Sequence, residues 1–514
     1  MELCTFFEFA VERHSDKVAV VEKNKRLTYA ELGEQVNQVA FSLQKLGLRK
    51  QDCVMILLKN RVETVVIYWA VQKLGAIFTP INFQLSKDDI RYCIHDVEPK
   101  FVVFEDLSEH LIMKETFKER PIFIGLSDGS QLSDISYREL EEGGVSFYEH
   151  VNVGAHDISS IYYTSGTTGV PKGVPRIHLN EYAATMAHIV QCRYQSFDRT
   201  LGNYPLYHVI GLRSLQAMTA LNGLYVALPD FDSYESLQMI DQEKISCLFL
   251  NPTMYHDLVS HPYSNEIDFS AVHTLAYSGA PMSEELITKC DEIMQPDRIV
   301  NHYGSTEIYT FTYCSDVRKK PGSSGQPGIH QHIKLITPDP EKRSSSTNVV
   351  STGEIGEIIV NMKSPEAFKG YWNRPNLTKK VIYDGWYYTG DLGFIDQDGD
   401  LKVIGRADDM ILSGGENIYP ELIEKILLEH DKVKEAVIIG EEDERLGQIV
   451  VAFIVPNDDS LTFQELDRFC KYHQQLPTYK RPRKYVFVES IPKSPTGKIL
   501  RSKLRNGQFI ELYL

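Results

Sequence analysis

Strands and helices alternate along the first part of this 514-residue chain, at a spacing that few folds allow. Thr28-Tyr-Ala-Glu31 has the form of a capping box, in which threonine and glutamate side chains satisfy the first N–H groups of a helix. We expect this helix to end before Gly47, and a strand, a helix and a second strand to follow at 53–58, 62–74 and 76–80. Since parallel strands are joined by crossover helices, the sequence predicts βαβ units and a parallel sheet.

The alternation returns after residue 173, with short apolar runs at 225–228, 247–250 and 275–278. From about Gly353 the pattern changes. Residues 353–360 and 401–404 have the composition of strands joined by tight turns, which favours an antiparallel or barrel-like portion. Asp396–Asp400 is expected to be a hairpin turn, because its glycine falls in the fourth place and a calcium loop requires one in the sixth.

A smaller unit is expected after the junction at residue 407. Residues 420–430 place their leucines and isoleucines on one helical face, and apolar runs predict strands at 437–439, 449–455 and 485–488. A chain of 514 residues exceeds the size at which a single core keeps growing. We therefore predict an α/β protein with an N-terminal domain at 1–407 and a small α+β domain at 408–514.

Charge and hydropathy exclude several classes of partner. The net charge of −16 argues against a nucleic-acid ligand, which requires a basic face. The longest apolar stretch, Val62–Phe83, contains Glu63, Gln72 and Lys73, so we expect a buried helix and a strand and no integral membrane segment. The first residues lack the layout of a signal peptide, and residues 510–514 form no retention or peroxisomal signal. A cytoplasmic protein is expected.

The cysteines and histidines show no metal-binding spacing. The eight cysteines contain no CxxC pair and the sixteen histidines form no zinc signature. Scattered cysteines of this kind are typical of reduced thiols in a cytosolic protein. The sequence therefore predicts no metal site built on cysteine or histidine.

The stretch Tyr163–Gly173, YTSGTTGVPKG, is the strongest candidate for an active site. A buried strand is expected at 158–163, and the loop after it combines glycines, which let the backbone approach a ligand closely, with hydroxyls and a cation. These residues are Thr164, Ser165, Gly166, Thr167, Thr168, Gly169 and Lys172. Such a loop suits a polyphosphate. It is not a Walker A loop, because Pro171 precedes the lysine and Gly173 follows it.

Five further strings carry chemically useful side chains: Pro205–Gly211, His302–Glu307, Tyr388–Asp391, Gly405–Glu421 and Pro492–Ile499. In the first, His208 stands among apolar residues, and a core histidine remains an alternative. The second combines an aromatic ring, a glycine, hydroxyls and a carboxylate, which suit base stacking and Mg²⁺ binding. The last lies within 478–505, where nine Lys/Arg accompany a single acid. This local excess of positive charge in an acidic chain favours an anion-binding site, and a solvated basic face is the alternative.

Together these strings resemble the motifs of the adenylate-forming superfamily, which comprises acyl- and aryl-CoA synthetases, luciferase and the adenylation domains of peptide synthetases. The resemblance spans essentially the whole chain, with the motifs in order. It implies a large N-terminal domain of two α/β sheets plus a distorted β-barrel, and a small mobile C-terminal domain. It also implies that ATP and a carboxylic acid form an acyl-AMP and pyrophosphate, and that a thiol then accepts the acyl group.

The resemblance also implies roles for individual residues. Catalysis would depend on Lys498, Lys172 and His208, with Lys498 bridging the carboxylate and the α-phosphate. The remaining roles concern ATP, Mg²⁺ and the domain movement: Thr164 to Lys172 for the outer phosphates, Thr164 and Glu307 for Mg²⁺, Tyr303 and Gly304 for adenine, Thr306 for the α-phosphate, Asp391 and Arg406 for ribose, Asp408 as the hinge, and 413–420 as the loop that enters for the thiol step.

The acid and the acceptor are less constrained. Relatives that activate amino acids carry an aspartate near His208, and this chain has none, so an amino acid is not expected. The chain is most similar to benzoate-type aryl-CoA ligases, which suggests an aryl or medium-sized acid in a pocket lined by His208, Val209, Leu250, Ala280, His302, Gly304, Tyr309 and Thr310. Coenzyme A is the expected acceptor, with Arg481 and Arg483 at its phosphates.

Two alternatives remain open. One is a stand-alone ligase that loads a carrier protein. The other is a luciferase-like or non-catalytic relative, which is disfavoured because Lys172, Glu307, Asp391 and Lys498 are all present. A monomer or a homodimer is expected.

Overall fold

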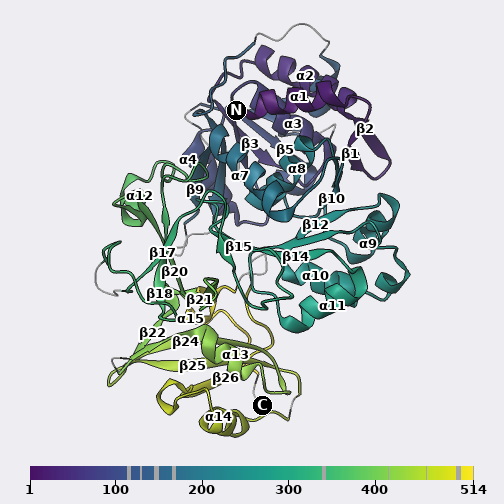
Figure 1. The fold of residues 1–514 in the computed structure, drawn as a ribbon. Helices are drawn as coiled ribbons and strands as arrows, with labels where there is room; N and C mark the ends of the chain where they lie inside the picture. Colours follow the sequence, from purple (N-terminus) through teal and green to yellow (C-terminus); the bar gives the residue numbers. More distant parts are fainter. Residues whose placement is uncertain are drawn as a thin grey trace. The chain divides into compact units, whose positions relative to one another are not determined.

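The computed structural model describes residues 1–112, 117, 119–127, 130–143, 150–164, 170–338, 343–414, 416–458, 460–493 and 499–512. It divides the chain into two compact units (Figure 1). Unit 1 comprises Met1–His332 and Asn361–Gly385, and unit 2 comprises Ile333–Val360 and Trp386–Leu514. The predicted domain boundary at 407/408 falls inside unit 2, where the barrel-like strands group with the C-terminal part.

Unit 1 contains two sheets. The first is parallel in its interior and has antiparallel strands at both edges. Its spatial order is β16 (Gln326–Pro327), β15 (Thr312–Cys314), β14 (Arg298–Tyr303), β13 (Thr274–Tyr277), β12 (Cys247–Leu250), β10 (Arg199–Gly202), β11 (Leu224–Ala227), β1 (Val18–Glu22) and β2 (Lys25–Thr28).

The second sheet is parallel up to β8, and β9 returns antiparallel to β8. Its order is β7 (Ile135–Ser136), β6 (Ile122–Gly125), β5 (Phe101–Phe104), β3 (Cys53–Leu57), β4 (Ile77–Pro80), β8 (Ile158–Thr164) and β9 (Lys172–Ile177). The predicted parallel α/β architecture is confirmed for unit 1.

The helices of unit 1 are α1 (Leu3–Arg13), α2 (Tyr29–Lys45), α3 (Val62–Lys73), α4 (Lys87–Val97), α5 (Asp106–Glu109), α6 (Tyr137–Glu142), α7 (His178–Cys192), α8 (Val209–Ala220), α9 (Ser233–Gln242), α10 (Pro252–Ser260), α11 (Glu284–Met294) and α12 (Pro375–Val381). The predicted capping box is confirmed, because the Thr28 side chain accepts from the Glu31 N–H at the start of α2 while Glu31 accepts from the Thr28 N–H. The apolar stretch after residue 62 forms the buried helix α3 and then β4, as expected.

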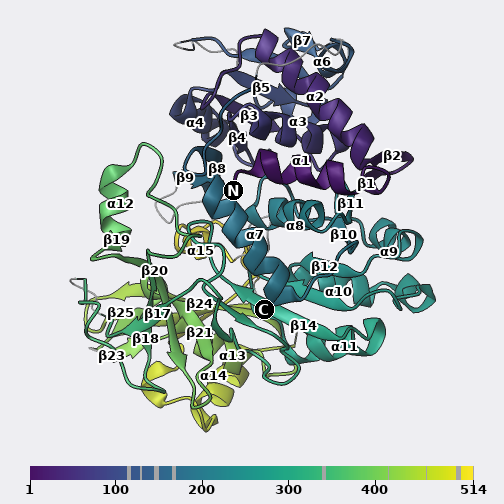
Figure 2. The ribbon, with the colours of Figure 1, turned by 45° about the horizontal axis from the view of Figure 1, so that its top comes forward.

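The main core lies between the two sheets. Alternate residues of each strand point to opposite sides. In β3, Val54 and Ile56 join the core that also contains Val20 and Phe249 from the first sheet, whereas Met55 packs on the other face. Helices α1, α2, α3, α7 and α8 fill this central layer, with α7 beside α8 (Figure 2). Among the described helices, we find none whose length and apolar character would let it cross a membrane.

Unit 2 contains two sheets of its own. The strands of the first are β17 (Ile333–Ile336), β18 (Gly356–Asn361), β20 (Trp386–Ile395) and β21 (Leu401–Arg406), together with the two-residue strand β19 (Ile382–Tyr383) that precedes β20. Those of the second are β23 (Glu416–Ile418), β22 (Ile411–Ser413), β25 (Gly447–Pro456), β24 (Val433–Asp443) and β26 (Lys484–Phe487). The helices are α13 (Pro420–Leu427), α14 (Phe463–Tyr472) and α15 (Arg501–Arg505). The described strands of the predicted barrel-like portion pair as an open sheet.

The turn between β20 and β21 is the predicted hairpin. The Asp396 side chain accepts from the N–H groups of Asp398 and Asp400, and Gly399 has a φ of 86°, a conformation that favours glycine. This pairing places Asp391, in the middle of β20, opposite Arg406 at the end of β21, and these are the two predicted ribose ligands.

Candidate active site

The β8–β9 hairpin positions the predicted phosphate loop. In its register Tyr163 pairs with Gly173 and Thr164 with Lys172, so Thr164 and Lys172 lie opposite each other at the end of the hairpin where the loop begins. The loop residues Ser165, Gly166, Thr167, Thr168 and Gly169 fall outside the described residues. Gly173 is closely packed: a Cβ there would lie 3.0 Å from that of Trp372, which would have to shift by a few tenths of an ångström.

Tyr371 connects this hairpin to the predicted metal ligand Glu307. The ammonium nitrogen of Lys172 lies 5.7 Å from the centre of the Tyr371 ring, and the Tyr371 hydroxyl donates a 2.6 Å hydrogen bond to Glu307 Oε1. Glu307 is buried. Tyr371 therefore contacts both Lys172 and Glu307, which the sequence assigns to one ATP site. Sequence reasoning missed Tyr371, which lies 64 residues after Glu307.

Gly304 lets the strand that carries Tyr303 pass close to the chain that follows it. A Cβ on Gly304 would lie 2.0 Å from the carbonyl oxygen of Tyr309, so no other residue fits without a backbone shift. The Phe311 N–H closes the turn by donating to the Tyr303 carbonyl at 2.7 Å. The segment 303–311 is thereby folded into a compact loop after β14.

The fully buried side chain of Arg176 donates hydrogen bonds to the backbone of this loop. Arg176 Nη1 donates to the carbonyl oxygens of Thr306, Glu307 and Glu366 at 3.1, 3.3 and 2.9 Å. Arg176 lies on β9, four residues after Lys172. The same strand therefore carries both the phosphate-loop lysine and the arginine that donates to the backbone of Glu307, the candidate Mg²⁺ ligand. The sequence analysis did not identify Arg176, because a single arginine in a strand has no distinctive spacing.

Arg176 belongs to a buried charge cluster. Its Nε pairs with Glu181 Oε1 at 2.8 Å, and Glu181 Oε2 pairs with Arg213 Nη2 at 3.1 Å, all with fully buried side chains. The Arg213 guanidinium lies 4.7 Å from the centre of the Tyr309 ring. Burial by itself raises the pKa of the Glu181 carboxyl, but the two guanidinium groups outweigh it and hold that pKa at about 2. Glu181 therefore stays ionised.

The predicted acid-pocket residues gather at one edge of the first sheet. Strands β10, β12, β13 and β14 are parallel neighbours, so their carboxyl ends meet at this edge, where open α/β sheets bind ligands. The predicted residues at or after these ends are His208, Val209, Leu250, Ala280, His302, Gly304, Tyr309 and Thr310. His302, Tyr309 and Thr310 are buried.

His208 forms the N-terminal cap of α8. Its Nδ1 accepts from the N–H of Ile210 at 3.4 Å, and its ring lies 5.1 Å from that of Tyr204. Burial lowers the pKa of His208 to about 4, so the imidazole is neutral at physiological pH. A neutral histidine at a helix N-terminus next to an apolar edge fits a positioning role better than that of a cation.

Two residues of α7 and one of β14 form a cluster that the sequence analysis did not foresee. His188, Cys192 and His302 are buried, and their ligand atoms lie within 4.8 Å of one another. Burial lowers the pKa of both imidazoles, to about 3 for His302, and raises the pKa of the Cys192 thiol. The sequence predicted no metal site on cysteine or histidine from spacing alone, and spacing could not reveal this group, because the fold joins residues 110 positions apart.

In unit 2 the predicted ribose ligands face each other. Asp391 and Arg406 are directly opposed across β20 and β21, and Arg406 Nη1 donates to Asp391 Oδ1 at 2.5 Å. Asp408 lies in a short 3₁₀ turn after β21. The loop predicted to enter for the thiol step follows as the hairpin β22–β23, in which Gly415 lies outside the described residues. Lys498 also lies outside them.

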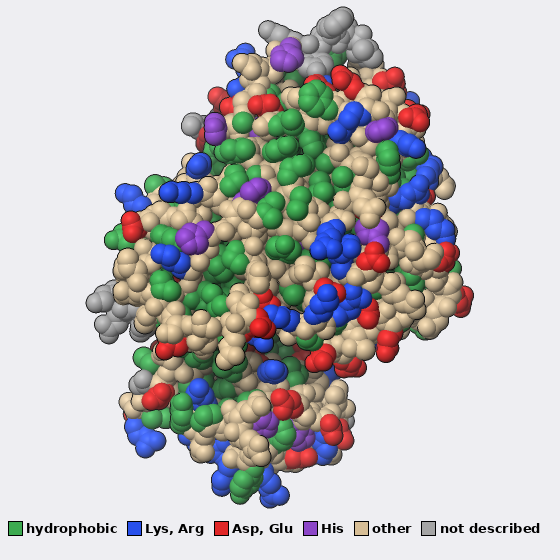
Figure 3. Space-filling model, in the orientation of Figure 1, with side chains coloured by type: hydrophobic (Ala, Val, Ile, Leu, Met, Phe, Trp, Pro, Cys, Tyr) green, Lys and Arg blue, Asp and Glu red, His purple; other side chains and the backbone are tan. Residues whose placement is uncertain are grey.

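The basic tail is more neutralised than its sequence indicates. Its cations pair with acids from other parts of unit 2: Arg481 with Asp467, Lys484 with Glu441, Lys493 with Glu435, Arg501 with Glu424, and Arg505 with Asp409. Figure 3 shows blue and red side chains interspersed around the lower part of the surface. Of the two predicted CoA ligands, Arg481 is thus paired, whereas Arg483 is exposed and forms no ion pair within the described residues.

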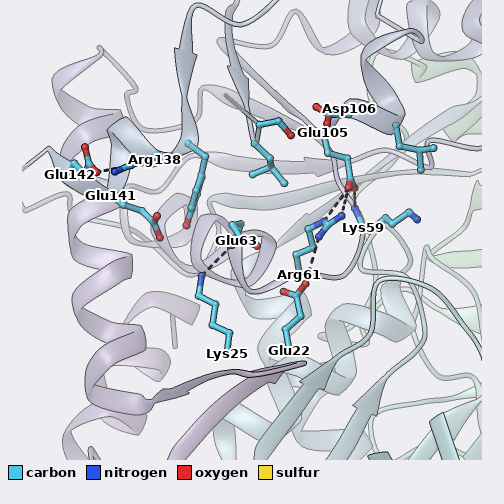
Figure 4. Close-up of a pocket in the computed structure, with 14 residues that line it drawn as sticks. Glu22, Lys25, Lys59, Arg61, Glu63, Glu105, Asp106, Arg138, Glu141 and Glu142 are labelled. Atoms are coloured by element: carbon cyan, nitrogen blue, oxygen red, sulfur yellow. Dashed lines mark hydrogen bonds and ion pairs between the residues drawn. The ribbon is translucent and has the colours of Figure 1, made fainter. Parts of the chain in front are cut away.

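A separate surface pocket of 790 Å³ lies in unit 1 and contains none of the predicted site residues (Figure 4). Its charged side chains pair with one another: Arg61 with Glu105 at 2.7 Å, Lys25 with Glu63 at 3.2 Å, and Arg138 with Glu142 at 2.7 Å. Six acidic and four basic side chains line this pocket, so it offers no excess of positive charge for an anion such as ATP.

Comparison with known proteins agrees with this geometry. The profile of the AMP-binding enzyme family matches residues 7–372, and that of the AMP-binding enzyme C-terminal domain matches 422–498. A long-chain-fatty-acid–CoA ligase of Mycobacterium tuberculosis is 32% identical over 490 residues, 93% of each chain. A feruloyl-CoA synthase of an Amycolatopsis species is 32% identical over 484 residues, again 93% of each.

The fold is also that of a solved ligase. The o-succinylbenzoate CoA synthetase of Bacillus subtilis, solved with its acyl-adenylate intermediate, has a TM-score of 0.83 and 27% identity over 99% of both chains. The resemblance to the adenylate-forming superfamily and the predicted enzyme class, an AMP-forming acid–thiol ligase, are confirmed. The chain belongs to the AMP-binding enzyme family.

Proposed function

We propose that this protein activates a carboxylic acid with ATP and transfers the acyl group to coenzyme A. The observation that carries the proposal is the meeting of Lys172 and Glu307 on Tyr371, beside the sheet edge where the acid-pocket residues gather. The names of the relatives, which are acid–CoA ligases, support the same reaction. A carboxylate resists nucleophilic attack because of its charge, and adenylation replaces that charge by an AMP leaving group.

Mg²⁺–ATP would be held by residues of suitable chemistry. Glu307 offers a carboxylate and Thr164 a hydroxyl, which are the hard oxygen ligands that Mg²⁺ prefers. When bound, Mg²⁺ neutralises phosphate charge. Lys172 and the loop 164–172 would hold the outer phosphates, and Tyr303, Gly304 and Thr306 would contact the adenine and the α-phosphate. Asp391 and Arg406 would hold the ribose, and Lys498 would bring the carboxylate and the α-phosphate together.

Two reaction halves require a movement of the C-terminal part. We keep the prediction that residues 408–514 rotate about Asp408, so that Lys498 serves adenylation and 413–420 serves the thiol step. The hairpin β22–β23 within 411–418 gives the second element a defined backbone that a rotation could move as a unit.

An aryl or medium-sized acid is the proposed substrate. The rings of His302, Phe249 and Tyr309 are buried and lie near one another, with ring centres 5.6 Å apart for His302 and Phe249 and 6.4 Å for His302 and Tyr309. Aromatic side chains gathered at this edge favour an aromatic acid, because aromatic rings pack well against one another. The relatives include both a fatty-acid ligase and a feruloyl-CoA synthase, so neighbouring acids should be tested together.

Coenzyme A is favoured over a carrier protein as the acceptor. The pairing of Arg481 with Asp467 leaves Arg483 as the better candidate for a CoA phosphate. We expect Arg483→Ala to raise the KM for CoA more than Arg481→Ala does. The eight cysteines are all free, in keeping with the proposed cytoplasmic location.

The test is acid-dependent exchange of pyrophosphate into ATP across benzoates, cinnamates and fatty acids, followed by thioester formation with CoA or a carrier protein. We expect exchange with aryl or medium-sized acids and thioester formation with CoA. Exchange with palmitate alone would refute the aryl assignment. Exchange without CoA thioester formation, but with carrier loading, would establish the alternative. No exchange with any acid, from a folded protein, would refute the proposed function.

A further inference from the structure

The His188–Cys192–His302 cluster has the composition and spacing of a metal site. Cys192 Sγ lies 3.2 Å from His302 Nε2, and 3.7 and 3.9 Å from Nδ1 and Nε2 of His188. All three side chains are buried. Thiolate and imidazole are the ligands that zinc and other soft transition metals select, whereas Mg²⁺ prefers oxygen.

The spacing agrees with a bound ion. In tetrahedral zinc sites the metal lies about 2.3 Å from sulfur and about 2.0–2.1 Å from nitrogen, which places S and N about 3.5 Å apart. The distances from Cys192 Sγ, 3.2 Å to His302 and 3.7–3.9 Å to His188, fall on both sides of that value. Each sulfur–nitrogen separation is therefore within a few tenths of an ångström of that value, and all three ligand atoms lie within 4.8 Å of one another.

The backbone sets this arrangement. His188 and Cys192 are four residues apart on α7, so they lie one above the other on the same face of the helix. On β14, Val300 points into the core between the sheets, and His302, two residues further on, points to the same side. Helix α7 runs through this central core, and its face meets the strand at the level of His302.

Tyr309 orients one of the ligands. Its hydroxyl lies 3.4 Å from Nδ1 of His188. A hydrogen bond at Nδ1 would leave Nε2, 3.9 Å from Cys192 Sγ, to bind the metal, in the way that metal-binding histidines are commonly fixed through their second nitrogen. Nδ1 of His302 is buried and has no hydrogen-bond partner within the described residues, which leaves its Nε2, directed at Cys192, as the only nitrogen in use.

We propose that His188, Cys192 and His302 bind a single soft transition-metal ion such as Zn²⁺. Binding replaces the thiol proton: the S–H bond of Cys192 breaks, a metal–sulfur bond forms, and the proton leaves to solvent, with no change of oxidation state. The three protein ligands leave a fourth position for water or another oxygen ligand. The site is separate from the Mg²⁺ proposed at Glu307 but shares His302 with the proposed acid pocket, so its test measures metal binding and not ligase activity.

The full-length protein, stripped with chelator and reloaded with zinc, would be assayed for metal content by mass spectrometry after desalting. Cobalt titration would report the ligand type, because Co²⁺ bound to thiolate gives an intense charge-transfer band. Cys192→Ser and His302→Gln would be compared with Cys290→Ser, which removes a buried thiol of α11 that lies outside the cluster. Circular dichroism would show that each variant is folded.

We expect stoichiometric metal and a cobalt–thiolate band in the wild type and in Cys290→Ser. Cys192→Ser should lose the band, and either ligand variant should weaken binding by more than about 100-fold, since changes outside the ligand set alone cost 10–100-fold. A wild type that retains no metal and gives no cobalt band would overturn the proposal and leave a thiol–imidazole hydrogen bond. Equal bands in Cys192→Ser and the wild type would overturn it too. Both outcomes leave the ligase proposal unaffected.

Discussion

Each unit contains a cluster of arginine and carboxylate side chains. In unit 1 two arginines share one carboxylate, whereas in unit 2 two glutamates share one arginine. In unit 1 a single carboxylate, Glu181, lies between Arg176 and Arg213. In unit 2 a single guanidinium, Arg501, lies 2.6 Å from Glu424 and 3.2 Å from Glu421. A third acid of unit 2, Asp409, lies 3.8 Å from Arg501 and pairs with Arg505 at 2.7 Å.

The ratio decides how each carboxylate titrates. Burial raises the pKa of Glu181, yet its two cations overcome this and hold the pKa at about 2. Burial also raises the pKa of Glu421, and the single shared Arg501, opposed by neighbouring Glu424, does not overcome it, so the pKa reaches about 7. The first cluster is fixed in one charge state across physiological pH, whereas the second exchanges a proton within that range.

This difference matches what each cluster contacts. The unit 1 cluster holds the backbone of Thr306 and Glu307, where a rigid support helps a preorganised site. The unit 2 cluster joins segments next to the predicted moving parts: Asp409 follows the hinge residue, Glu421 follows the 413–420 loop, and Arg501 comes shortly after Lys498. A cluster that can lose part of its charge is suited to segments that must rearrange.

The largest expected effect is at Arg176. Arg176→Met removes one of the two partners of a fully buried carboxylate, so the free energy of unfolding should fall by about 3–5 kcal/mol. Urea unfolding measures this. Replacing Arg176, Glu181 and Arg213 together by Met, Leu and Met removes all three charges and should recover most of the stability. Adenylation should stay low in the triple variant if Arg176 positions Thr306 and Glu307. If Arg176→Met unfolds with the same free energy as the wild type, the claim that the buried Glu181 depends on both arginines is contradicted.

Arg501→Met should have a smaller effect that depends on pH. Although Glu424 is buried, Glu421 is partly accessible and can take up a proton, so we expect a loss of about 1–3 kcal/mol rather than the full cost of a buried unpaired charge. The loss should be larger at pH 8 than at pH 6, because the acids repel one another most when all are ionised. Urea unfolding at both pH values tests this. A loss independent of pH would mean that the acids do not share the cation.

Glu421→Gln should stabilise the protein above neutral pH. A carboxyl whose folded pKa of about 7 exceeds its ordinary value of 4.5 favours folding below pH 4.5 and progressively less as pH rises to 7. Removing that charge should therefore raise the free energy of unfolding at pH 8, by roughly 1 kcal/mol for a partly exposed group, and have little effect at pH 5. Glu181→Gln, at the opposite cluster, should destabilise at both pH values. The same sign in both variants would contradict the ratio argument.

The smallest effect on stability is expected for the partly buried pair of Asp391 and Arg406. Their side chains are 16% and 33% exposed, so Asp391→Asn should change the free energy of unfolding by no more than about 1 kcal/mol. If these residues hold the ribose, the KM for ATP should nevertheless rise clearly. An unchanged KM would leave the pair with a structural role only.

The architecture could largely be predicted because it depends on local patterns. The capping box at Thr28, the buried helix after residue 62 and the turn at Asp396 each have a signature within a few residues, and all are confirmed. The resemblance supplied the superfamily. What it could not supply were contacts between distant residues with ordinary spacing: Tyr371 with Glu307, and Arg176 with Thr306.

The sequence analysis missed the His188–Cys192–His302 cluster and the ion pairs of the basic tail for related reasons. His188 and Cys192 have a helical spacing that suits shared ligation, but the third residue, His302, is 110 positions away from Cys192. In the tail, the local excess of Lys and Arg said nothing about acids brought in by other strands and helices, such as Asp467 for Arg481. Charge along the chain therefore predicts a binding surface less well than charge in the folded unit.

The central claim is that one protein runs two half-reactions with different residues, and Lys498→Ala tests it most directly. Single-turnover assays would follow acyl-AMP formation from acid and ATP, and separately the transfer of acyl from supplied acyl-AMP to CoA. We expect adenylate formation to be abolished, because no other cation is assigned to the meeting point of carboxylate and α-phosphate, while thioester formation persists. Equal loss of both half-reactions, in a variant with native stability, would contradict the account.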